Sequence, residues 1–150
     1  MAKLALLYRL ESDKEEKLRA DFLGAQQHWQ SHQQKLNGLN QFRQEYFAQL
    51  TQKAQAGLSS AGFSHYQNFI SKIDQAIEQQ TQVVETAYRV TEQRQSQWRQ
   101  QRVRTEAVAK LIEKEKLKQQ AKLAKAEQKM LDEFATNQFY ARRRSGETGM

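Results

Sequence analysis

The chain has 150 residues, with 24 lysines and arginines against 17 aspartates and glutamates, and it contains neither cysteine nor proline. The missing cysteines exclude disulfides, thiolate metal ligands and cysteine nucleophiles, and they fit a reducing compartment. An apolar content of 38% is low for a compact globule of this length, but it suffices for a coiled coil, which needs only a narrow apolar seam. We therefore expect one elongated helical domain.

The start of the chain carries no recognisable targeting segment. The sequence MAKLALLYRLE is too short and too soon charged to be a signal peptide, and no apolar run approaches the length of a membrane span. The sequence therefore predicts a cytoplasmic protein.

A first long helix is predicted over residues 3–56, because no proline interrupts it and a proline would cost a helix interior about 3 kcal/mol. Within it, residues recur at alternating intervals of four and three, which is typical of a heptad seam with left-handed supercoiling. The seam positions are Leu18, Phe22, Ala25, Trp29, His32, Leu36, Leu39, Arg43, Tyr46 and Leu50. The polar interruptions are His32 and Arg43, and upstream Leu4, Leu7 and Leu10 fit the register poorly.

A turn is predicted at residues 57–63, where Gly57 and Gly62 enclose two serines. The glycines have the spacing of a phosphate-binding loop, but Phe63 stands where that loop needs a lysine. No strand precedes the segment either, so it is interpreted as the turn of a helical hairpin.

A second, longer helix is predicted over residues 64–137, with Ser64 as its N-cap. Its seam is strong at Tyr66, Ile70, Ile73, Ile77, Gln80, Val84 and Ala87. It weakens through Thr91, Arg94 and Gln101, with Trp98 as an isolated anchor, and it resumes at Val108 and Ile112. The expected fold class is all-α, with two long helices in an antiparallel coiled-coil hairpin over residues 1–137. The second helix should overrun the first, and residues 138–150 should form a basic, disordered tail.

All of the excess positive charge lies late in the chain, since residues 89–150 hold 15 basic and 8 acidic residues while residues 1–88 hold 9 of each. Such a patch implies an acidic partner, which could be nucleic acid, an anionic lipid surface or an acidic protein face. A nucleic-acid-binding coiled coil with a basic C-terminal helix is therefore an alternative function. A membrane-surface helix over residues 111–134 is a third, although its apolar face is sparse.

No constellation of residues points to catalysis or to a cofactor. His28 and His32 lie one helical turn apart, but no third metal ligand is evident, and His32 falls on the seam as a packed polar residue. Adjacent carboxylates such as Asp132 and Glu133 point to different helix faces. We therefore expect no enzyme, no catalytic residue, no metal, no cofactor and no small-molecule substrate.

Six aromatic residues flank the predicted turn. They are Phe42, Tyr46, Phe47, Phe63, Tyr66 and Phe69. The seam accounts for Tyr46 and Tyr66, whereas Phe42, Phe47 and Phe69 stand beside it. They are either exposed anchors for a binding partner or residues that widen the seam.

Three segments resemble the flagellar FliJ family of the type III export apparatus. They are HYQNFISKIDQAIEQQ (residues 65–80), QFRQEYFAQL (residues 41–50) and KMLDEFA (residues 129–135). The resemblance implies a non-enzymatic, two-helix coiled coil similar to the central stalk of rotary ATPases, serving flagellum biogenesis, chemotaxis and motility. Its joined ends are expected to bind the hexameric export ATPase.

The resemblance also implies further partners. These are the cytoplasmic domain of the membrane export gate and the export chaperones, so the protein would associate peripherally with the inner-membrane export apparatus. The gate-binding surface maps onto Leu39, Phe42, Tyr46, Phe69, Ile73 and Ala76. Lys35 and Gln80, at the rim of that surface, depart from the family's pattern. No motif fixes the residues that would contact the ATPase, and nucleic acid is not among the implied partners.

Overall fold

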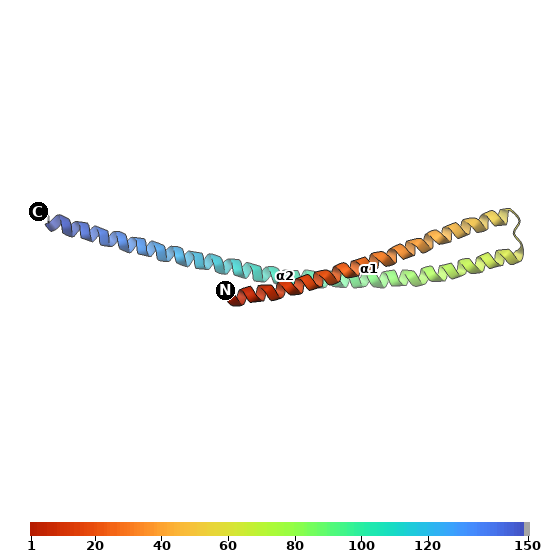
Figure 1. Cartoon of the computed structure of the whole chain (residues 1–150), viewed down its shortest axis with the longest axis horizontal. Coiled ribbons are helices and arrows are strands. Elements are labelled where there is room, and N and C mark those ends of the chain that lie inside the picture. The colour runs from red at the N-terminus through yellow and green to blue at the C-terminus, as the bar shows by residue number, and fades with distance from the viewer. Residues whose placement is uncertain (149–150) are drawn as a thin grey trace. The chain divides into compact units, whose positions relative to one another are not determined.

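The computed structural model describes residues 1–148 and contains two helices, α1 (Ala2–Gln55) and α2 (Ser60–Thr148), with no strand in that part of the chain (Figure 1). The predicted fold class is confirmed, because the protein is all-α and its second helix is the longer one. Both helices are rich in alanine, glutamine, glutamate and lysine, which favour helix, and neither contains proline.

The turn between the helices depends on a glycine in the left-handed region. The backbone of Gly57 has a φ of 97°, and its N–H donates to the carbonyl of Ala54 at 3.3 Å. A side chain would strain this conformation, so glycine is the residue that ends α1 most easily.

A serine caps the start of α2, but it is Ser59 and not Ser64. The hydroxyl of Ser59 accepts a hydrogen bond from the N–H of Gly62 at 3.2 Å, and its carbonyl accepts one from the N–H of Phe63 at 2.9 Å. This is the geometry of an N-cap, in which the serine stands three residues before a free backbone donor. The predicted cap was therefore wrong, because Ser64 already lies inside the helix.

The C-terminal end of α2 also differs from the expectation. Residues 138–148 belong to the helix, where a disordered tail was expected, and residues 149–150 lie outside the described part of the chain. The segment contains alanine, arginine and aromatic residues, and only Gly146 is a poor helix former, at about 1 kcal/mol relative to alanine. The cost of this single glycine is too small to end a helix that the preceding residues have already formed.

Contacts divide the chain into two compact units, and one of them is Ser12–Val103. In it, all ten predicted seam positions of α1 are buried or half-buried. On α2 the buried residues of this unit are Ile73, Gln80, Val84, Ala87, Thr91 and Gln101. They keep the alternating spacing of four and three, so the heptad interpretation of this unit is confirmed, polar positions included.

The other unit combines Met1–Glu11 with Arg104–Met150. Here Thr105 and Val108 are buried, and the hydroxyl of Thr105 donates to the carbonyl of Glu11 at 3.2 Å. Leu4 is half-buried and stands two heptads before Leu18, so it keeps the register, contrary to the prediction. Leu7 and Leu10 are exposed. The charged residues between Leu4 and Leu18 hid the register from the sequence pattern.

Candidate partner-binding site

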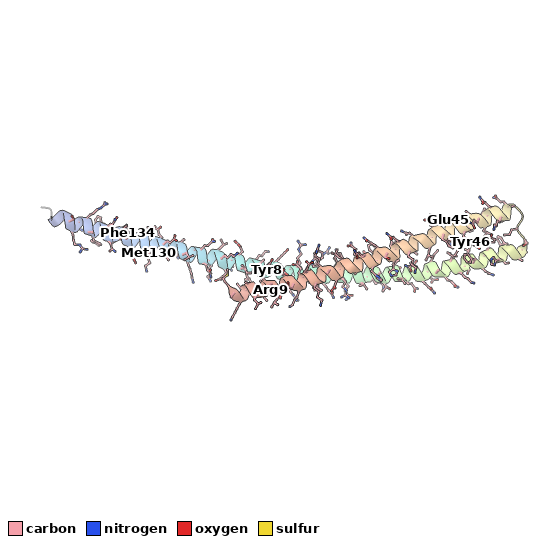
Figure 2. All side chains as sticks on the ribbon, in the orientation of Figure 1. Tyr8, Arg9, Glu45, Tyr46, Met130 and Phe134 are labelled. Carbon is pink, nitrogen blue, oxygen red and sulfur yellow. The ribbon has the colours of Figure 1, made fainter. Side chains whose placement is uncertain are left out.

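Three aromatic rings meet on one side of the helix pair in the unit Ser12–Val103, and we call them the aromatic patch: Phe42 and Tyr46 of α1 with Phe69 of α2. Ring centroids lie 4.6 Å apart for Tyr46 and Phe69, and 6.3 Å apart for Phe42 and Phe69. Figure 2 shows Tyr46 on the side of α1 that faces α2. Phe42 is 46% and Phe69 37% exposed, so both rings present apolar surface to solvent.

The other three predicted site residues contribute less surface. Ile73 is only 6% exposed and lies in the seam, so it supports the patch from within and offers little to a partner. Leu39 and Ala76 are half-buried. Their spacing from Phe42 and Phe69 places them along the same side of each helix. The structure therefore brings the aromatic residues together in ring contact and leaves the aliphatic ones as a partly covered margin.

Polar contacts fix the two helices against each other near the turn. The guanidinium of Arg43 donates to the carboxylate of Asp74 from Nε at 2.5 Å and from Nη2 at 3.4 Å. The hydrogen bond first, and the charge of Asp74 second, raise the pKa of Arg43 above its ordinary value. Lys53 donates to the hydroxyl of Tyr66, and this bond raises the pKa of Lys53. Both contacts join α1 to α2 in the same unit as the aromatic patch.

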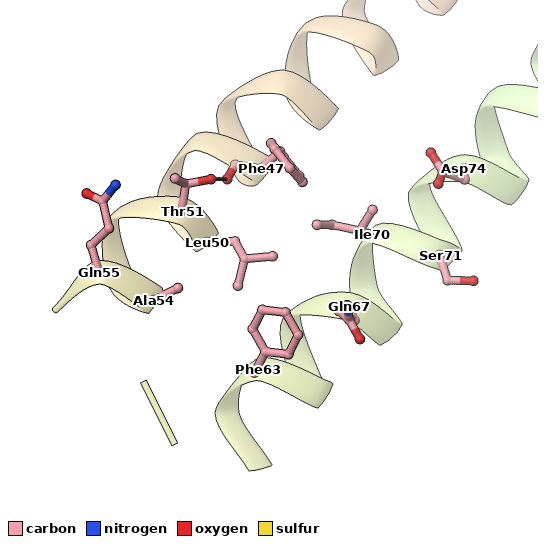
Figure 3. A pocket seen from close by; sticks show the side chains of 10 residues that line it. All are labelled: Phe47, Leu50, Thr51, Ala54, Gln55, Phe63, Gln67, Ile70, Ser71 and Asp74. Carbon is pink, nitrogen blue, oxygen red and sulfur yellow. Dashed lines mark hydrogen bonds between the residues drawn. The ribbon is translucent and has the colours of Figure 1, made fainter. Parts of the chain in front are cut away.

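A second apolar surface, which we call the tip groove, lies on the other side of the same helix pair. Phe47, Leu50, Phe63 and Ile70 form its apolar lining, and its volume is about 720 Å³ (Figure 3). Thr51 stands on its wall and donates to the carbonyl of Phe47 at 3.0 Å. The predicted site list omits this groove. Its signal was present, because residues 47 and 54 on α1 and residues 63 and 67 on α2 recur at helical spacing around the seam residues Leu50 and Ile70.

The seam histidine is held by a glutamine of the opposite helix. The side-chain amide of Gln80 donates to the carbonyl of His32 at 2.9 Å and lies 3.1 Å from its Nδ1. The ring of His28 meets that of His32 edge-on at 4.4 Å. His32 is therefore a packed polar residue of the seam, as predicted. Within residues 1–148, no three histidine, aspartate or glutamate side chains gather as metal ligands would.

Within residues 1–148, no second helix covers the last part of α2. Every described side chain from residue 116 to residue 146 is exposed. The exposed apolar residues include Leu123, Met130 and Phe134, the last two labelled in Figure 2. In the described helices, no segment combines the length and the apolar character that crossing a lipid bilayer requires. This stretch therefore offers its side chains to a partner along its whole length.

Comparison with known proteins identifies a family. The sequence model of the family described as "Flagellar FliJ protein" matches residues 1–144. No curated protein and no solved structure matches. Members of the matched family are structural components of the flagellar export apparatus and are not known as enzymes. The match covers nearly the whole chain, and the protein therefore belongs to the FliJ family of flagellar export components.

Proposed function

We propose that this protein is a non-enzymatic stalk and adaptor of the flagellar export apparatus. It works in the cytoplasm beside the inner membrane and binds the hexameric export ATPase through the helix ends remote from the turn. Through the side of the hairpin near the turn it binds the cytoplasmic domain of the export gate, and it assists export chaperones. The exposed aromatic patch is the observation that carries this proposal.

The patch has the chemistry of a protein-binding surface. Phe42 and Phe69 expose much of their rings, although they also contact Tyr46 or each other. Aromatic side chains dominate the binding energy of many interfaces because each buries a large rigid area with little loss of entropy. The partly exposed Arg43–Asp74 ion pair joins the two helices close to these rings.

The stalk role is supported by the last part of α2. A helix of some thirty residues with every described side chain exposed is stable chiefly by its own propensity, and its apolar residues gain most when another protein covers them. A ring of subunits around the helix would provide such a cover.

Substitution of the patch tests the gate-binding role. We expect Phe42→Ala with Phe69→Ala to lower the affinity for the purified cytoplasmic domain of the gate by about tenfold or more, as loss of two aromatic anchors does. The matched control is Phe47→Ala with Phe63→Ala, which removes the same side chains from the tip groove. It should bind the gate domain as the wild type does, measured by titration calorimetry.

Circular dichroism checks that both variants keep their helical content. Unchanged gate affinity in the patch variant would refute the site, and an equal loss in both variants would show that the tip is recognised without distinction between its two sides. Co-purification with the export ATPase, scored by ATPase activity, tests the stalk role separately.

A further inference from the structure

The first part of α1, residues 2–21, which we call the strap, buries little apolar surface. None of its side chains is fully buried, and the half-buried ones are Leu4, Glu11, Ser12, Glu15 and Leu18. Two of these five are apolar. In residues 29–50, nearer the turn, five of the eight buried or half-buried side chains are apolar or aromatic: Trp29, Leu36, Leu39, Tyr46 and Leu50. The hydrophobic effect therefore holds the strap less firmly than the rest of α1.

The seam that joins the strap to α2 is polar. Glu11 and Glu15 stand seven and three residues before Leu18, so both occupy seam positions of α1. On α2, Gln101 and Thr105 are buried, and the hydroxyl of Thr105 donates to the carbonyl of Glu11 at 3.2 Å. Removing a carboxylate partly from water costs free energy, and a polar residue at a seam position sets the register at a cost in stability.

The strap is followed by a packed aromatic contact and then by a weak position of the helix. Phe22 is the first buried residue of α1, and its ring stacks on that of Trp98 with the centroids 5.6 Å apart. Two residues further on, Gly24 lies inside α1 with open space where a Cβ would stand. Glycine is a poor helix former. Gly38, the other glycine of α1, has a seam leucine on each side of it, so the seam supports the helix there.

We propose that the strap detaches from α2 by local unfolding, with Gly24 as the joint, while the rest of the hairpin stays paired. Segments held by few apolar contacts are the ones that open locally. A free helix of about twenty residues is marginal in water, so the detached strap loses most of its helical hydrogen bonds. Detachment uncovers Val108, which is buried, and Ile112, which lines a hollow together with Tyr8. The opening needs no partner, so it is independent of the proposed function.

Native-state hydrogen exchange of the full-length chain, measured by mass spectrometry, tests the strap. After correction for intrinsic rates, the amides of residues 7–21 should exchange about tenfold or more faster than those of residues 36–50. The two segments have the same length and lie equally far from the nearer end of α1, so fraying of the helix ends affects them alike. Equal protection of the two segments would overturn the proposal.

Two pairs of variants test the polar seam and the joint. Glu15→Leu with Gln101→Leu makes two seam positions apolar and should slow exchange of residues 7–21 by about tenfold or more. The matched control, Glu16→Leu with Gln100→Leu, changes the same residue types one position away, where both side chains are exposed, and should change exchange by less than about twofold.

Gly24→Ala should slow exchange of the strap by about fivefold, because the opened segment loses a better helix former. Gly38→Ala gives the same gain in helix propensity outside the strap and should leave the exchange of residues 7–21 unchanged. If the exposed control slowed exchange as much as the seam variant, the polar seam would not govern the opening. If the two glycine variants acted alike, Gly24 would not be the joint. Either result would overturn the proposal.

Discussion

Residues 60–115 and residues 116–148 belong to the same helix, α2, but they differ in how far their side chains are buried. In the first stretch, side chains at heptad spacing are buried or half-buried against α1, from Tyr66 to Glu115. In the second, every described side chain up to residue 146 is exposed, although apolar residues recur there too. The seam therefore determines where the helices pair, while helix propensity alone extends α2 beyond that pairing.

The largest expected effect comes from placing a charge in the paired seam. Ile73→Asp buries an unpaired carboxylate at a position that is 6% exposed, and we expect a loss of about 4 kcal/mol or more in the free energy of unfolding. Met130→Asp places the same carboxylate on the unpaired stretch and should change stability by less than about 0.5 kcal/mol. Urea unfolding followed by circular dichroism measures both. If the two variants lost similar amounts of unfolding free energy, the paired and unpaired stretches of α2 would not differ in their contribution to stability.

A smaller effect is expected at Trp98, where the seam is mostly polar. Its ring stacks on that of Phe22 at 5.6 Å, and its Nε1 is buried without a hydrogen-bond partner. Trp98→Ala should therefore cost about 3 kcal/mol through lost packing. Trp98→Phe keeps an aromatic ring and removes the unpaired donor, so its effect should stay below about 1 kcal/mol. If Trp98→Phe lowered the free energy of unfolding as much as Trp98→Ala, the indole N–H would have to form a hydrogen bond in solution that the structure does not contain.

The smallest effects concern two glycines. Gly57→Ala forces a side chain into a left-handed backbone and should cost about 1 kcal/mol, weakening the turn that pairs the helices. Gly24 lies inside α1 with open space around its Cα, so Gly24→Ala should stabilise the chain by about 0.5–1 kcal/mol. Thermal unfolding midpoints of the two variants should shift in opposite directions. Shifts of the same sign would mean that the turn relaxes more easily than its φ indicates.

The pairing of the helices could be predicted from the sequence because it depends on periodicity. The seam from Leu18 to Leu50 was predicted position by position, including the polar His32 and Arg43. Helix ends were predicted less well, since several serines near the turn could cap a helix and only the backbone geometry selects Ser59. The extension of α2 was missed because a cluster of arginines with Gly146 has the composition of a tail as well as of a helix.

The candidate site could be predicted only in part. The positions of Phe42 and Phe69 beside the seam left open whether they are exposed anchors or widen the seam, and the structure shows that both are exposed and contact Tyr46. The tip groove around Phe47 and Phe63 was not predicted as a surface. Its lining comes from both helices, and which flanking residues share a side depends on how the two helices are rotated against each other. Sequence spacing predicts which residues share a face of one helix, but it does not predict which faces of the two helices lie next to each other.

The matched heptads of the two helices limit how the length of this chain can change. One residue inserted into either paired stretch would turn the following side chains by about 100° and carry the seam out of contact. Compensated insertions of whole heptads in both helices would keep the faces aligned. Insertions after Glu115 do not shift the paired seam. We therefore expect homologues to differ in length most at that end, which an alignment of their sequences would test.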